Sequence, residues 1–249
     1  MDKLYINLEL KANRFRQDNG LSLTEAIRLK SVLHKNRILT VFLPLSSSFS
    51  GMAVKIYKEK EAKRFMLINS NMTIGRQHFT ICHELYHLYF QENFTSEKTG
   101  SIPFNKSGDP EEYNADVFAS YLLMPTHGLL QLIPDAERRK NKISLSTILS
   151  VEQYYSCSRS ALLYRLWRME LLDKDRFDHF SADKIKNALL HGYSVDLYQP
   201  GNNGVVIGDY GSLARELYEK GIVSESSYFS LLEDIGINLS DFDHRVDNE

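Results

Sequence analysis

The chain has 249 residues, of which 43% are apolar and 25% charged, and its formal net charge is −2. This is the composition of an ordinary globular protein, and it gives no overall attraction to nucleic acid or to an anionic membrane. Two cysteines without a CxxC pair exclude a cysteine-rich metal site and fit a reducing compartment. The charged N-terminus does not fit a secretory signal, and no apolar run reaches membrane-helix length. We therefore expect a cytoplasmic protein with no membrane partner.

Two helices are predicted before the first strand. The opening segment has helical periodicity and is broken at Asn19-Gly20. Ser22, with Glu25 three residues later, forms a capping-box pattern, in which each side chain satisfies a backbone N–H that the helix leaves free. This pattern predicts a second helix that starts at Ser22 and runs to about Leu33.

Three β-like runs come next. A spacer rich in serine separates the first two runs, and a charged turn separates the last two. Spacers this short favour an antiparallel meander. We therefore expect a small three-stranded antiparallel sheet over residues 38–45, 52–57 and 64–69.

A metal-binding pattern lies in the helix predicted over residues 75–90. Residues 83–87 read HELYH, which is an HExxH pattern. On a helix, His83 and His87 are separated by one turn and about 40°, so both imidazoles can bind one zinc ion. Glu84 lies beside them, where it can take a proton from water instead of binding the metal. The alternative is an ordinary pair of core or surface histidines, and the periodic helix after a predicted sheet disfavours it.

A catalytic zinc site needs a third protein ligand, and the next predicted helix offers one. The stretch from residue 91 to 109 is predicted to be an exposed loop. Pro110 is placed to open a helix that runs to about Met124, where Pro125 stops it.

Glu112 is the favoured third ligand. Glu112 and Asp116 are four residues apart and share a face, so Asp116 can accept a hydrogen bond from the outer ring nitrogen of His83. Glu111 is the competitor and points about 100° away. Carboxylates at a helix N-terminus are also favoured by the macrodipole alone.

Other polar residues are weaker candidates for the site. Tyr113, Tyr121 and His127 flank the third ligand and could stabilise an oxyanion or contact substrate. For each of them, a packing or surface position is the favoured interpretation. His78 lies about 140° around the helix from His83, so we do not expect it to reach the same ion.

Two sequence blocks resemble the ImmA/IrrE metallopeptidases. Residues 76–87 read RQHFTICHELYH, and residues 112–125 read EYNADVFASYLLMP. The family typically shows R-x-x-F-T-x-x-H-E-x-G-H and E-x-x-A-N-x-F-A-x-x-L-L-M-P. The resemblance covers residues 1 to about 172. It implies a mainly helical, minigluzincin-like α+β core.

The resemblance also assigns roles. It implies one zinc ion held by His83, His87 and Glu112, with Glu84 as the catalytic base. Two positions depart from the pattern: Tyr86 replaces the usual glycine, which would narrow the cleft beside the zinc, and Asp116 replaces the common asparagine. Gluzincin-type peptidases use aspartate at this offset, so the second departure does not threaten the site.

The implied activity is that of a zinc-dependent endopeptidase. Its implied substrate is a helix-turn-helix repressor of the Xre type, which is cut so that repression is relieved. The alternative is a non-proteolytic regulator that binds a repressor or DNA and has structural zinc. Glu84 favours the enzyme, because a structural site has no need of it and would usually close with a fourth protein ligand.

Three parts are predicted along the chain. They are a zinc metallopeptidase domain over residues 1–137, a helix-turn-helix-like segment over 138–172, and a small C-terminal extension over 173–249. A basic cluster at residues 138–142 is interpreted as a linker. Helices are predicted in the extension over residues 213–217, stopped by Gly221, and over residues 224–234.

The second part has two predicted helices, over residues 145–155 and 159–172, with Ser158 able to cap the latter. Their spacing resembles a helix-turn-helix, in which Arg159, Arg165 and Arg168 could face phosphates. We favour the alternative, a helical pair that completes the core and keeps the arginines on its solvated side. DNA contact is therefore not the favoured interpretation.

Overall fold

A computed structural model describes residues 3–58, 61–92, 94, 96–99, 104 and 108–237. Its strands are β1 (Ile38–Leu43), β2 (Gly51–Lys58), β3 (Glu61–Asn69), β4 (Ser96–Thr99) and β5 (Val206–Ile207). Its helices are α1 (Lys3–Asp18), α2 (Leu29–Lys35), α3 (Ile74–Phe90), α4 (Pro110–Leu123), α5 (Thr126–Leu132), α6 (Leu145–Tyr155), α7 (Arg159–Arg168), α8 (Lys174–Ser181), α9 (Lys184–Leu190), α10 (Tyr210–Glu219) and α11 (Glu225–Glu233), with 3₁₀ turns η1 (Asp135–Glu137) and η2 (Asp196–Tyr198).

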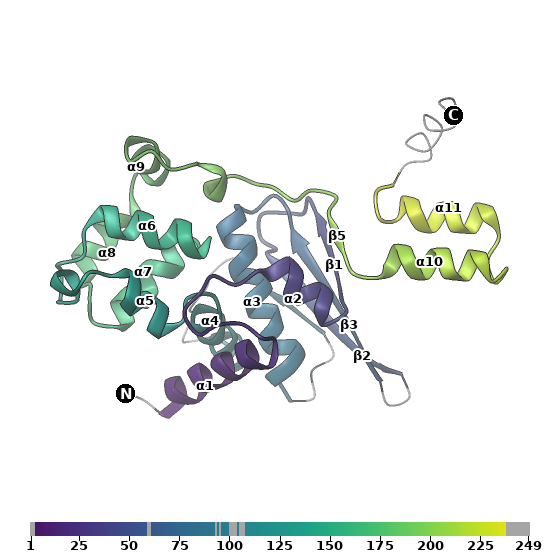
Figure 1. The fold of residues 1–249 in the computed structure, drawn as a ribbon, viewed down its shortest axis with the longest axis horizontal. Helices are drawn as coiled ribbons and strands as arrows, with labels where there is room; N and C mark the ends of the chain where they lie inside the picture. Colours follow the sequence, from purple (N-terminus) through teal and green to yellow (C-terminus); the bar gives the residue numbers. More distant parts are fainter. Residues whose placement is uncertain are drawn as a thin grey trace.

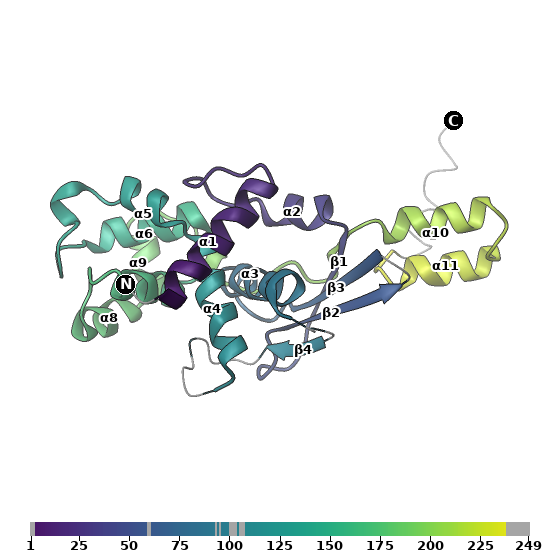
Figure 2. The ribbon, with the colours of Figure 1, turned by 90° about the horizontal axis from the view of Figure 1, so that it is seen from below.

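The sheet and the helix α3 form the middle of the molecule. Helices α5 to α9 cluster at one end, and the pair α10–α11 projects from the other (Figures 1 and 2). Helix α3 packs on β2 and β3, and α4 packs between α3 and α1. The predicted α+β class with a mainly helical core is confirmed. Within the described residues, no helix combines the length and apolar character needed to cross a membrane.

The sheet is mixed, with strand order β4-β2-β3-β1-β5. Strands β2 and β3 are antiparallel, but β1 runs parallel to β3 with Ile38 opposite Arg64. The prediction of three antiparallel strands is therefore wrong in strand number and in one direction. The physical reason is the β1–β2 connection, which passes the end of β3: the buried Asn69 amide donates to the carbonyls of Ser46 (2.8 Å) and Phe49 (2.7 Å) and holds the connection there.

One face of the sheet is buried under α3. Alternate residues of β1 and β3 point toward it, among them Ile38, Phe42, Met66 and Ile68, which are all 0–1% exposed. The helix approaches closely because Gly51 has no side chain: a Cβ there would lie 2.5 Å from Thr80 Cγ2. Helix α3 thus rests directly on the sheet.

Helix α1 ends at Asp18, as predicted, but the second helix does not start at Ser22. It starts at Leu29, and the capping-box prediction is wrong. The buried guanidinium of Arg16 binds the carbonyl oxygens of Ser22 (2.7 Å) and Glu25, so this segment makes tertiary contacts in place of a helical turn. The Ser22 hydroxyl accepts from the backbone N–H of Thr24.

Helices α3 and α4 match the predictions to within one residue. Asp109 caps α4 by accepting from the backbone N–H of Glu111, and Pro110 occupies its first turn. The stretch between the helices is only in part the predicted exposed loop, because Phe94 is buried and β4 pairs with β2. Residues 93, 95, 100–103 and 105–107 lie outside the described residues.

The helical pair α6–α7 forms as predicted, with α7 ending at Arg168, and Ser158 caps α7 by accepting from the N–H of Ala161. The prediction of solvent-facing arginines is wrong for two of the three. Arg159 and Arg165 are 1% and 3% exposed, so neither faces solvent or a phosphate. Arg159 pairs with the buried Glu152, and the Arg165 guanidinium lies 4.1 Å from the ring centroid of Tyr121.

Arg168 is exposed, as predicted. The basic cluster at residues 138–142 is the short connection between η1 and α6, in which Arg138 pairs with Asp135. In the C-terminal extension, α10 is followed by Gly221 (φ +66°) and α11 begins after Ser224, as predicted. Ser224 caps α11 by accepting from the backbone N–H of Ser227. The division into three parts stays a prediction.

After α9, residues 193–207 cross the N-terminus of α3, and we call this segment the strap. Its Gln199 carbonyl accepts from the backbone N–H of Ile74 (2.9 Å). The buried amide of Gln77 on α3 donates to the carbonyl of Gly201 (3.0 Å), and Asn202 donates to the Gln77 oxygen (2.9 Å). The strap then ends as β5, paired with β1.

Candidate metal centre

Helix α3 presents His83 and His87 on one face, as their four-residue spacing predicts. Both side chains are buried, at 1% and 0% exposure. Their Nε2 atoms lie 3.0 Å apart. The two nitrogens are therefore close enough to bind one ion.

Glu112 completes this group from the first turn of α4. Its Oε2 lies 3.3 Å from His83 Nε2, and its Oε1 lies 3.2 Å from His87 Nε2. The Glu112 side chain is 28% exposed, so the group is open to solvent on the carboxylate side. Among the described residues, these three form a cluster able to hold a metal ion.

The separations suit a single small metal ion. A tetrahedral zinc ion about 2.0–2.2 Å from each ligand atom, for example, would hold those atoms roughly 3.3–3.6 Å apart. The two Nε2 atoms are 3.0 Å apart, and they lie 3.3 and 3.2 Å from different oxygens of Glu112, Oε2 and Oε1. Two imidazoles and one carboxylate are also the donor set of catalytic zinc sites that keep a fourth position open.

The outer nitrogen of each histidine has its own partner. His83 Nδ1 lies 2.8 Å from Asp116 Oδ1, as predicted, and Asp116 also accepts from the backbone N–H of Phe104. His87 Nδ1 bonds Gln91 Oε1, a partner that the sequence analysis missed although its i,i+4 spacing from His87 could have indicated it. Such partners place the proton on Nδ1 and leave Nε2 free for a metal.

The hydrogen bond between His83 and Glu112 shifts the pKa of both groups. Burial alone would lower the pKa of His83, but hydrogen bonds with Asp116 and Glu112 outweigh it and raise the pKa to about 10. Burial alone would raise the pKa of Glu112, but its hydrogen bonds with both histidines lower the pKa to about 2. The carboxylate is therefore ionised, and the buried site favours a positive charge at its centre.

Glu84 follows His83 on α3 and is fully buried. Helix geometry places it about 100° around the axis from His83 and about 60° from His87. Its negative charge contributes to the raised pKa of His83, which shows that the carboxylate lies near the metal-binding group. Glu84 is outside the cluster of three ligand atoms.

Tyr86 fills the position where the resembled family has glycine. The ring is buried, and its hydroxyl donates to Glu111 Oε2 over 2.9 Å. The Lys11 ammonium lies 5.3 Å from the ring centroid. The side chain is thus directed to α1 and the start of α4, where it engages the glutamate that competes with Glu112.

The structure also locates the three weaker candidates. The Tyr113 hydroxyl lies 2.6 Å from that of Tyr5 and 3.1 Å from that of Tyr164. Tyr121 lies nine residues beyond Glu112, or roughly 13 Å along α4. His127 is exposed on α5. These positions give no support to an oxyanion role for Tyr121 or His127, and His78 binds the Ser156 carbonyl (2.8 Å) instead of the metal group.

Fold and site together define a metallopeptidase-type centre, with two histidines on one helix and a glutamate on the next. Residues 38–167 match the peptidase family described as the IrrE N-terminal-like domain. The match covers more than half of the chain, and the chain belongs to this family. A search of curated proteins finds no match to it.

Proposed function

We propose that this protein is a zinc-dependent endopeptidase. The observation that carries the proposal is the convergence of His83, His87 and Glu112 at separations that suit one zinc ion. A buried glutamate, Glu84, lies next to this group on the same helix. A structural zinc site would need neither the open position nor the additional carboxylate.

In the proposed hydrolysis, different residues of the chain transfer the proton and position the metal ligands. Zinc, when bound, supplies a Lewis acid that polarises the scissile carbonyl and lowers the pKa of a water molecule. Glu84 takes the proton from the attacking water and passes it to the leaving amine. Asp116 and Gln91 hold the imidazoles of His83 and His87 in the orientation and tautomer that the site needs.

The proposed substrate is a helix-turn-helix repressor of the Xre type. The support is the resemblance of residues 76–87 and 112–125 to the ImmA/IrrE metallopeptidases. Cleavage would relieve repression, and the enzyme would then act in the cytoplasm as an anti-repressor. Direct DNA binding is not part of the proposal, because Arg159 and Arg165 are buried.

The test mixes the purified protein with a helix-turn-helix repressor of the Xre type, taken from a neighbouring gene where one encodes it, and follows cleavage by mass spectrometry. We expect one or a few defined cuts, which disappear with a chelator and with Glu84→Gln. Glu92→Gln is the matched control, because Glu92 is exposed and lies just after α3. If Glu84→Gln relieves repression in cells as well as the wild type does, the protein acts as a non-proteolytic regulator and the proposal fails.

A further inference from the structure

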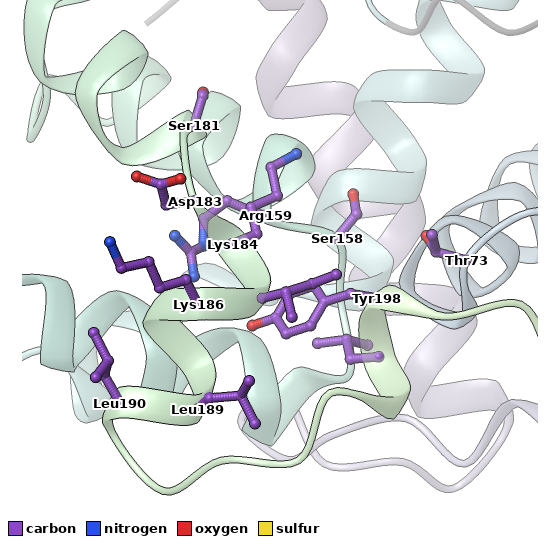
Figure 3. A pocket seen from close by; sticks show the side chains of 12 residues that line it. Thr73, Ser158, Arg159, Ser181, Asp183, Lys184, Lys186, Leu189, Leu190 and Tyr198 are labelled. Carbon is purple, nitrogen blue, oxygen red and sulfur yellow. The ribbon is translucent and has the colours of Figure 1, made fainter.

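A hollow of about 810 Å³ lies away from the metal centre (Figure 3). It is formed by the N-terminus of α7, by α9 and by η2, and it reaches Thr73 at the start of α3. We call it the α9 hollow. No step of the proposed hydrolysis uses it.

Four of the twelve side chains that line the α9 hollow are aliphatic. Ile185, Leu189 and Leu190 on α9 line it and are 43%, 62% and 72% exposed. Leu197 on η2 lines the opposite side. Three exposed aliphatic side chains on a seven-residue helix form the kind of patch that marks an interaction surface.

The floor of the α9 hollow is a neutralised ion pair. The buried Arg159 guanidinium bonds the carboxylate of Glu152 through two of its nitrogens and donates to the Phe180 carbonyl (3.0 Å). The Tyr198 hydroxyl, visible in the middle of Figure 3, donates to the same carboxylate. The floor is therefore fixed in place, and its charge is already balanced.

Of the two lysines that line the α9 hollow, Lys186 is exposed and Lys184 is the more buried, and Lys184 makes no ion pair among the described residues. Its side chain is half-buried, and its ammonium lies 3.4 Å from the Ser160 hydroxyl. Across the part of the chain that the structure describes, no carboxylate lies within ion-pairing distance of it, the adjacent Asp183 included. Burial lowers the pKa of Lys184 and the like charge of Arg159 lowers it further, while the negative charge of Glu152 opposes them only in part. An anionic group in the hollow would offset both effects.

We propose that the α9 hollow binds a segment of another protein in which an acidic side chain is flanked by aliphatic ones. The carboxylate would pair with Lys184, and the aliphatic side chains would cover Leu189 and Leu190. This binding goes beyond the proposed hydrolysis and does not depend on it.

Two other occupants fit the surface less well. A nucleic-acid backbone needs several cations, whereas this hollow is mostly apolar. A small amphipathic anion enclosed in the hollow would leave Leu189 and Leu190 in water, because both lie mainly at its exposed rim. A peptide segment covers the rim and the hollow together, as in other helix grooves.

The experiment selects random 12-residue peptides displayed on phage against the full-length, zinc-loaded protein. The enriched peptides are then synthesised and titrated by fluorescence polarisation. We expect them to carry aspartate or glutamate beside leucine or isoleucine. Lys184→Glu and Leu190→Glu should each raise the Kd at least about tenfold, the effect of losing one good contact.

Matched controls distinguish a change in the α9 hollow from a general effect of the new charge on the protein. Lys140→Glu changes an exposed lysine elsewhere, and Leu10→Glu changes an exposed leucine on α1, so neither should alter the Kd. A peptide with lysine in place of its acidic residue should lose binding to the wild type and regain it with Lys184→Glu. Unchanged thermal unfolding shows that a variant is folded, and Lys184→Gln replaces Lys184→Glu if it is not.

Several results would overturn the proposal. One is that no enriched peptide depends on Lys184 or Leu190. Another is that decanoate binds in a Lys184-dependent manner while peptides do not, which would make the hollow a small-molecule site. A third is that a DNA duplex, and no peptide, binds in a manner that Lys184→Glu abolishes.

Discussion

The Tyr86 hydroxyl donates to Glu111 across 2.9 Å, and this bond separates the roles of two adjacent glutamates. Glu111 is held against α3 by the tyrosine, while Glu112 faces both imidazoles. The pair also fastens the first turn of α4 to α3, one residue before the proposed ligand. A position occupied by glycine in the resembled family therefore contributes a cross-link between the two helices of the site.

The two glutamates should differ in their effect on metal binding. Glu112→Ala removes one of three ligands, and we expect loss of zinc at stoichiometric concentration. Glu111→Ala should retain zinc, with a stability loss of about 1–3 kcal/mol because the buried Tyr86 hydroxyl loses its acceptor. Zinc content after dialysis and urea unfolding measure the two effects. The reverse pattern would refute the assignment of Glu112.

Removing the partners of the imidazoles should weaken zinc without abolishing it. Asp116→Ala and Gln91→Ala should each raise the zinc Kd by about 10–100-fold, because the imidazoles lose their fixed tautomer. Asn114→Ala on the same helix is the control, since Asn114 lies near Glu111 and has no contact with either histidine. Competition with a chromophoric chelator gives the Kd values, and an unchanged Kd for Asp116→Ala would contradict the prediction.

Gly128 should not tolerate a side chain. A Cβ there would lie 2.0 Å from Tyr155 Oη and 2.4 Å from the Thr24 carbonyl oxygen, which are themselves hydrogen-bonded to each other. Gly128→Ala should lower the free energy of unfolding by about 1–3 kcal/mol through overpacking. Gln131→Ala, at an exposed position of the same helix, should leave it nearly unchanged. Equal stabilities of the two variants in urea would show that this contact is not tight.

Removing one partner of the buried ion pair between Glu152 and Arg159 should strongly lower the free energy of unfolding. Glu152→Gln leaves an uncompensated buried guanidinium, and we expect a loss of about 3–5 kcal/mol in the free energy of unfolding. The double variant with Glu152→Leu and Arg159→Met should recover a large part of this loss. A double-mutant cycle in urea, with Glu152→Leu and Arg159→Met made singly and together, measures the coupling. Additive effects of the two changes would argue against a coupled pair.

Alkaline pH should destabilise the protein in part through Tyr198. Burial and the hydrogen bond to Glu152 raise the pKa of Tyr198 to about 12, above its ordinary value of 10. The stabilising contribution of the neutral hydroxyl is complete below about pH 10, the pKa in the unfolded chain, and is lost as pH rises through 12. Tyr198→Phe should therefore lose less stability than the wild type between pH 10 and 12. Parallel stability curves for the two proteins would contradict this assignment.

The site could be predicted from the sequence more accurately than the sheet, because the sequence signals for the site are local. The ends of α4 are marked by Pro110 and Pro125. Four-residue spacings bring His83 and His87 to one face of α3, and Glu112 and Asp116 to one face of α4. The parallel pairing of β1 with β3 depends instead on the buried Asn69, whose side chain holds a connection more than twenty residues earlier. A spacer length alone carries no information about such a contact.

Burial of charge was equally hard to foresee. Arg159 and Arg165 follow a pattern typical of a solvated helix face, but both are buried. Glu152 neutralises Arg159. The ring of Tyr121 covers Arg165. In the same way, Arg16 takes the carbonyls that a helix starting at Ser22 would have used. In each case the deciding partner is tertiary, so a local pattern predicts the wrong environment.

The strap has a practical consequence for dissecting this protein. A fragment that ends at residue 172, near the limit of the family match, would leave the Gln77 amide without its Gly201 and Asn202 partners. It would also bare the hydrogen-bonding edge of β1, where Phe42 pairs with Val205 and Gly204. Such a fragment should aggregate when expressed, whereas one that ends after Gly208 retains both sets of bonds. The smallest fragment expected to keep these contacts thus reaches well past α4, the second helix of the metal-binding group.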